Sequence, residues 1–283
     1  MPEGRPGLLK IWAGVESLPL IDPAPPSGCE SLAEELFRGE ILRPLPRDLE
    51  PVPLLSLPWY QSAERLRYQR QGHWLPASLE FARHSGEKVL GIGGGLGSDW
   101  VGYARNGCEV IVVCSSTEQR DLVQRNFDLR RLSARCEHAS CFALPATTAS
   151  IDVVCLTGPL ASETLPAALD EVYRVLKPGG KIMLVVPAAR SIEQLQRWLP
   201  GGRAEKSCSS GLLGGHRYTT AEIWRLLNRF NEAKLSRRHL RRAEVPTLLR
   251  LTPLFLMERF VGRLLVYKGF KPLSAAKAET IAA

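Results

Sequence analysis

The chain has 283 residues, of which 45% are hydrophobic and 23% are charged, and its formal net charge is +8. This composition is that of an ordinary globular protein and excludes the disordered, collagen-like and disulfide-rich classes. No segment holds the roughly eighteen consecutive apolar residues of a membrane-spanning helix, and the first residues lack the apolar run of a signal peptide. We therefore predict a cytoplasmic protein. Its seven cysteines contain no Cys-x-x-Cys pair, so we assign no metal.

Prolines set the character of residues 1–58, which hold eleven of them, including those at positions 23, 25, 26, 44, 46, 51, 53 and 58. Such a density prevents regular backbone ladders, so we predict a proline-rich arm that lies on the surface or is partly disordered, with one short helix over 31–37. Residues 59–84 are predicted to form a helical lid with four buried positions, namely Leu66, Leu75, Leu79 and Phe81. Residues 273–283 are predicted to be a flexible tail.

From residue 88 onward, short apolar runs alternate with helical periods. Strands are predicted over 88–92, 109–114, 151–157, 181–186 and 263–270, and helices over 98–106, 116–132, 165–176, 191–199 and after Thr219. Asp99 is interpreted as the N-cap of the first of these helices. The alternation predicts an α/β fold over 59–272: a Rossmann-like three-layer sandwich with a mostly parallel, seven-stranded sheet whose last strand is antiparallel.

A glycine loop joins the first of these strands to its helix. Residues 89–97 read Val-Leu-Gly-Ile-Gly-Gly-Gly-Leu-Gly, with glycines at Gly91, Gly93, Gly94, Gly95 and Gly97. Such a loop lets the backbone approach a ligand closely and aims helix N-terminal N–H groups at it. A P-loop needs a Lys-Ser/Thr pair after its last glycine, and the next residues, Ser-Asp-Trp, do not provide one. The dinucleotide pattern is also a poor match, because no acid follows about twenty residues later.

Three strings together carry a resemblance to a known family. They are residues 89–99 (Val-Leu-Gly-Ile-Gly-Gly-Gly-Leu-Gly-Ser-Asp), residues 150–154 (Ser-Ile-Asp-Val-Val) and residues 170–180 (Asp-Glu-Val-Tyr-Arg-Val-Leu-Lys-Pro-Gly-Gly). With them, the chain resembles the class I S-adenosylmethionine-dependent methyltransferases of type 11, a group that includes quinone and sterol methyltransferases. The resemblance implies S-adenosylmethionine as cofactor and a small, lipophilic methyl acceptor.

The chain departs from this family at the polar positions of the cofactor site. The resemblance implies acids at Gly91, for the methionine end, at Cys114, for the ribose, and at Ser140 or Cys141, for the adenine. Ser115 offers a neutral hydroxyl beside the ribose position, and Thr157, at the end of the strand over 151–157, is a further candidate cofactor-binding residue. Loss of a two-pronged carboxylate contact to the ribose costs roughly 3–6 kcal/mol, or a hundredfold or more in affinity.

Two interpretations of function stay open. In the first, the loop still holds the cofactor, and methyl transfer needs only alignment of the acceptor with the sulfonium methyl group, without a dedicated catalytic residue. In the second, the chain is a pseudoenzyme whose fold persists for binding or scaffolding, since a fold alone does not imply activity. The missing acids favour the second interpretation and membership of the family favours the first.

Residues 233–261 hold the one local concentration of charge. A basic stretch with Lys234, Arg237, Arg238, Arg241 and Arg242 runs into an apolar, proline-broken one. Such a segment can contact an anionic membrane surface or cover a lipophilic substrate. The simpler interpretation is an edge strand and a helix on the core, with arginines in solvent. Specific nucleic-acid binding is not expected, because no aromatic residues alternate with these arginines.

Overall fold

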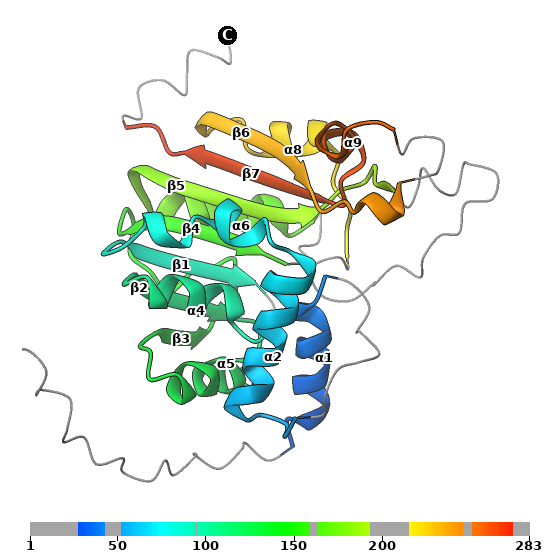
Figure 1. Ribbon diagram of the computed structural model, residues 1–283. Coiled ribbons are helices and arrows are strands. Elements are labelled where there is room, and N and C mark those ends of the chain that lie inside the picture. The colour runs from blue at the N-terminus through cyan, green and yellow to red at the C-terminus, as the bar shows by residue number, and fades with distance from the viewer. Residues whose placement is uncertain are drawn as a thin grey trace, which may run out of the picture.

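The computed structural model describes residues 28–42, 52–93, 95–158, 163–192, 215–245 and 251–273, and Figure 1 shows their arrangement. Several predictions fall outside these ranges: most of the helix over 191–199, the basic and apolar residues at 248–250, Gly94, and the tail from 274. No helix in the described ranges has the length and apolar character needed to cross a membrane.

Seven strands form one sheet, as the sequence predicts. In chain order they are β1 (Lys88–Gly93), β2 (Glu109–Cys114), β3 (Arg135–His138), β4 (Ile151–Thr157), β5 (Leu176–Pro187), β6 (Asn231–Arg238) and β7 (Leu264–Phe270). Their order across the sheet is β3-β2-β1-β4-β5-β7-β6. The first five pair in parallel, and β7 is antiparallel to both β5 and β6. The mostly parallel sheet with an antiparallel last strand is therefore confirmed.

Helices cover both faces of the sheet and give the predicted three layers (Figure 1). On one face, α6 (Leu165–Val175) and α8 (Thr220–Leu226) bury their apolar side chains against the strands. On the other face lie α3 (Leu75–Leu79), α4 (Ser98–Arg105) and α5 (Thr117–Leu129). Because both faces are covered, β1, β2 and β4 are apolar along nearly their whole length.

The fifth strand begins earlier than the sequence predicts. Helix α6 ends at Val175, and β5 starts at the next residue, Leu176, instead of at residue 181. Leu176 pairs with Ile151, and the register then shifts before Val153 pairs with Lys181. The Lys-Pro-Gly-Gly segment is thus an irregular first part of the strand. Proline and glycine are typical of turns, and a hydrophobic pattern does not reveal a bulge. The sequence therefore placed this segment before the strand.

The predicted lid is helical but broken into short pieces. It consists of α2 (Leu57–Arg65), a π-helix (Leu66–Gln71), α3 and a 3₁₀ turn (Phe81–Arg83). The four positions predicted to be buried, at residues 66, 75, 79 and 81, are all buried.

The helix of the proline-rich arm belongs to the core, in contrast to the predicted surface arm. Helix α1 spans Glu30–Glu40 and is longer than the predicted 31–37. Ala33, Phe37 and Ile41 are buried in a cluster shared with α2 and α5, and the ring centroids of Phe37 and Trp59 lie 5.1 Å apart. Helix α1 is therefore a packed helix of the core, and the prolines at positions 23, 25, 26, 44, 46 and 51 lie outside the described residues.

Glu80 connects the lid to the sheet and gives a pH-dependent prediction. Its carboxylate accepts hydrogen bonds from Lys181 in β5 and Lys268 in β7. Burial raises its pKa, but these bonds and the two lysine charges outweigh burial and lower the pKa from 4.5 to about 2. A carboxyl group whose pKa is lowered on folding stabilises the protein above the unfolded pKa, and this stability is lost as pH falls through the folded one.

We therefore expect the wild type to lose about 2 kcal/mol more free energy of unfolding than Glu80→Gln as the pH falls from 5 toward 2. Urea unfolding at several pH values measures this difference. Parallel loss of stability by the two proteins would contradict the role assigned to Glu80.

Candidate functional site

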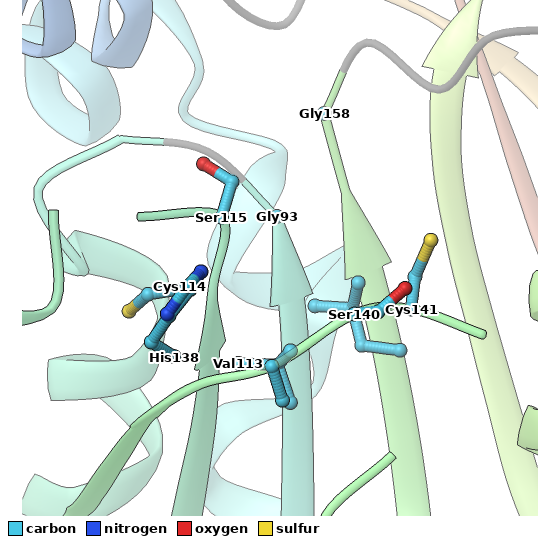
Figure 2. Close-up of a pocket in the computed structure, with 10 residues that line it drawn as sticks. Gly93, Val113, Cys114, Ser115, His138, Ser140, Cys141 and Gly158 are labelled. Carbon is cyan, nitrogen blue, oxygen red and sulfur yellow. The ribbon is translucent and has the colours of Figure 1, made fainter. Parts of the chain in front are cut away.

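A cavity of about 500 Å³ opens at the carboxyl edge of the sheet, where β1 and β4 lie side by side and the chain order across the sheet reverses (Figure 2). Ligands of open α/β sheets bind at such a position. The lining residues come from the ends of strands and the loops that follow them: Ile92, Gly93, Val113, Cys114, Ser115, His138, Ala139, Ser140, Cys141 and Gly158. We call this cavity the edge pocket.

Half of the predicted site residues meet in the edge pocket. Gly93, Cys114, Ser115, Ser140 and Cys141 line it, as predicted. The other described candidates, Gly91, Gly95, Gly97 and Thr157, do not line it, and Gly94 lies outside the described residues. The sequence analysis missed Ile92, Val113, His138, Ala139 and Gly158, although all five stand within two residues of a predicted pocket residue or of the end of β4.

Gly93 is required by the close approach of two strands. A side chain there would place its Cβ 1.9 Å from the carbonyl oxygen of Thr157, so only glycine fits. Thr157 thus packs beside the loop and helps to shape it. Its side chain is buried and stands outside the pocket lining, so its contact with a cofactor stays a prediction.

Among the residues that the structure describes, the lining holds no Asp, Glu, Lys or Arg side chain. Cys114 occupies the position of the expected ribose acid, and burial raises the pKa of its thiol to about 12, so it is neutral at physiological pH. Ser140, at the adenine position, accepts a hydrogen bond from the backbone N–H of Phe142. Burial also raises the pKa of the Cys141 thiol. The edge pocket therefore offers hydroxyl groups, an imidazole and apolar side chains.

The carboxylate of Glu40, the last residue of α1, lies on the glycine loop. Its Oε1 accepts hydrogen bonds from the backbone N–H groups of Leu96, at 2.7 Å, and Ser98, at 3.3 Å. From the opposite side, the Gln119 side chain in α5 donates to the carbonyl oxygen of Gly95. The sequence predicts loop amides that face a ligand. In the structure, two of these amides instead donate hydrogen bonds to the carboxylate of Glu40.

A buried ionic network fixes this carboxylate in place. Arg67 donates through Nε and Nη2 to the two carboxylate oxygens of Asp99, at 2.9 and 2.6 Å. Its Nη1 donates to the carbonyl oxygen of Glu40, and its Nε lies 3.5 Å from Glu40 Oε2. Tyr68 completes the network with a 2.6 Å hydrogen bond to Asp99. The interpretation of Asp99 as an N-cap is therefore wrong, since Gly97 holds the N-cap position of α4.

Trp100 fills the space where the expected acid at Gly91 would stand. A Cβ on Gly91 would lie 2.6 Å from Cδ2 and Cε3 of the Trp100 indole, which is fully buried. Gly91 is therefore a packing glycine beneath α4.

Comparison with known proteins agrees with this architecture. Residues 90–184 match the family described as methyltransferase domain. Residues 90–184 of the chain are therefore similar to a methyltransferase domain. The matched residues include the glycine loop and run to Leu184 in β5, so the matched region contains the edge pocket. No curated protein sequence matches the chain.

Solved structures share the fold of this chain at low sequence identity. The geranyl diphosphate C-methyltransferase from Streptomyces coelicolor A3(2) is 14% identical, with a TM-score of 0.52 over 89% of this chain and 100% of that chain. The [4+2]-cyclase SpnF is 16% identical, with a TM-score of 0.50 over 76% and 83% of the two chains. One fold thus serves a methyltransferase and a cyclase, so activity must be argued from the site.

S-adenosylmethionine is the cofactor that the methyltransferase family implies, and the residues of this chain fit it only in part. The edge pocket has the size of a site for a nucleoside. None of the described lining residues carries a carboxylate that could bind a ribose or face a sulfonium cation. Two loop amides are bonded to Glu40, and the indole of Trp100 closes the Gly91 position. The site as a whole therefore does not fit this cofactor.

Proposed function

We propose that this chain is a binding protein that holds a neutral, nucleoside-sized ligand in the edge pocket and does not transfer methyl groups. The observation that carries the proposal is the edge pocket itself, which is open and whose described lining residues carry no carboxylate, ammonium or guanidinium group. A charged ligand would lose its hydration there without meeting an opposite charge. A neutral ligand has no such desolvation penalty.

The glycine loop supports the same proposal. In a site that binds an amino-acid arm, free N–H groups at a helix N-terminus would receive the carboxylate of the ligand. Here Glu40 already accepts from Leu96 and Ser98, so an incoming carboxylate would have to displace it from a buried position. The amino-acid arm of S-adenosylmethionine therefore adds little binding free energy, and the nucleoside part contributes most of the affinity.

Isothermal titration of the full chain with adenosine and with S-adenosylmethionine tests this proposal. We expect adenosine to bind, and S-adenosylmethionine to bind no more tightly than adenosine. Both should bind a hundredfold or more less tightly than the micromolar affinity of a site with its acids intact, since a lost carboxylate contact costs roughly 3–6 kcal/mol. Micromolar binding of S-adenosylmethionine, or absence of adenosine binding, would overturn the proposal.

A pair of matched variants locates the binding. Ser115 is exposed and lines the edge pocket, so Ser115→Trp should fill the cavity and remove the adenosine signal while leaving the fold intact. Ser85 is exposed in the turn before β1, at the amino edge of the sheet, and Ser85→Trp should leave adenosine binding unchanged. Equal effects of the two substitutions would place the ligand elsewhere.

Methyl transfer from S-adenosylmethionine to a small, lipophilic acceptor is the second candidate. It is favoured by the position of the edge pocket at the carboxyl edge, with Ser115 and Ser140 hydroxyls at the places of the ribose and adenine acids. Incubation with S-adenosylmethionine carrying a labelled methyl group and a lipid extract distinguishes the candidates. Label in an acceptor, lost in Ser115→Trp and kept in Ser85→Trp, would establish the second one.

A further inference from the structure

Helix α9 (Leu254–Val261) presents an apolar face to solvent. None of its residues is fully buried. Leu254, Met257 and Val261 pack against a small cluster of Ile192, Leu240 and Val245. The residues that alternate with them along the helix point away from the protein. They are Phe255, Leu256, Arg259 and Phe260, and we call them the α9 outer face.

The aromatic side chains of the α9 outer face are unusually exposed for their type. Phe255 is 74% exposed and Phe260 is 63% exposed, and Leu251, just before the helix, is 98% exposed. Adjacent large apolar side chains exposed on one surface mark a contact with another molecule or a membrane. Figure 1 places α9 beside β6, at the edge of the sheet.

Arginines surround the α9 outer face. Arg259 is exposed within it, and Arg238, Arg241 and Arg242 are exposed on the neighbouring end of β6 and the turn that follows. Arg242 donates to the carbonyl oxygen of Thr252, immediately before α9. Of the nearby acids that the structure describes, Glu244 is buried against Arg263. The other, Glu258, binds Arg238 and the backbone N–H of His239, which holds α9 on the sheet. The surface is therefore apolar at its centre and basic around it.

We propose that the α9 outer face docks onto an anionic lipid surface, with Phe255 and Phe260 inserted among the acyl chains and the arginines bound to the headgroups. A helix with apolar side chains on its outer face and arginines beside them has the properties of an interfacial membrane helix. Each arginine near an anionic leaflet adds to the attraction between the protein and the lipid headgroups. The proposal does not depend on what the edge pocket binds.

A second copy of the chain fits this surface poorly. A stable interface buries about 800 Å² on each partner. The three apolar side chains of the α9 outer face supply at most about 750 Å², even if each buried the roughly 150–250 Å² of a whole aromatic side chain. A symmetric contact would also bring the same arginines of both copies together, and like charges repel. An anionic lipid surface instead complements the charge and requires no matching protein shape.

Co-sedimentation with vesicles tests the proposal. We expect the full chain to bind vesicles of equal parts phosphatidylcholine and phosphatidylglycerol at low salt, and to bind phosphatidylcholine alone at least about tenfold more weakly. Raising the salt concentration should release the protein. Equal recovery with the two vesicle types would overturn the proposal.

Variants at exposed positions separate the α9 outer face from general basicity. Phe255→Ser with Phe260→Ser, and separately Arg259→Glu, should each weaken binding about tenfold or more. The control is Leu273→Ser, which replaces an exposed side chain beyond the other end of β7 and should leave binding unchanged. Thermal unfolding checks that all variants keep the fold. The double phenylalanine variant could instead lose a dimer that the wild type forms and still bind vesicles as the wild type does. That result would show that a second copy of the chain covers the α9 outer face, and it would overturn the proposal.

Discussion

Replacing Arg67 with alanine is expected to lower the free energy of unfolding by about 3–5 kcal/mol, because it leaves two buried carboxylates without their shared cation. The side chains of Arg67, Glu40 and Asp99 are each 4–5% exposed. Burial lowers the pKa of Arg67, but the charges of Asp99 and Glu40 outweigh burial and raise it, so the guanidinium stays charged. Urea unfolding followed by tryptophan fluorescence measures the loss.

Arg38→Ala is the matched control for this substitution. Arg38 also pairs with a glutamate, Glu34, at 3.5 Å, but the two side chains are 63% and 61% exposed. A surface pair of this kind contributes at most about 1 kcal/mol. Similar losses for Arg67→Ala and Arg38→Ala would show that the buried network does not hold α1 and the glycine loop together.

The fold was predictable because its signals are local. The glycine loop and the string that ends at Gly180 each lie within about a dozen residues, and each apolar strand or helical period is itself short. A mostly parallel sheet with helices on both faces follows from them through right-handed crossovers. Strand β3 was not assigned a range because it is a four-residue edge strand without buried side chains, so it carries no hydrophobic period.

The occupants of the site were not predictable because they come from distant segments. Glu40 meets the amides of Leu96 and Ser98 across more than fifty residues, and nothing near it in the sequence indicates that contact. Asp99 stands near a helix start and has the residue type of a cap, and its true partner, Arg67, lies 32 residues earlier. Sequence patterns reveal which polar groups are missing, whereas the packing shows what has taken their place.

Trp100 is the clearest case of such a replacement, and it leads to a coupled pair of substitutions. Gly91→Ala alone is expected to destabilise the protein by about 3 kcal/mol, because the new Cβ would meet the indole at 2.6 Å. Trp100→Ala alone should cost about 3–5 kcal/mol through the cavity that it leaves. In the double variant the new methyl group occupies part of that cavity, so the two losses should not add.

A double-mutant cycle by urea unfolding measures this coupling. We expect the double variant to lose about 2 kcal/mol less free energy of unfolding than the sum of the losses in the two single variants. Substitutions at contacting residues couple strongly, whereas the effects of independent substitutions add within about 0.5 kcal/mol. Additive losses would mean that the indole can move aside at no cost. If the coupling is found, an aspartate at position 91 can be accommodated only with a smaller residue at position 100. Aspartate at positions 91 and 114, with Trp100 unchanged, would then unfold the domain and would not create a cofactor site.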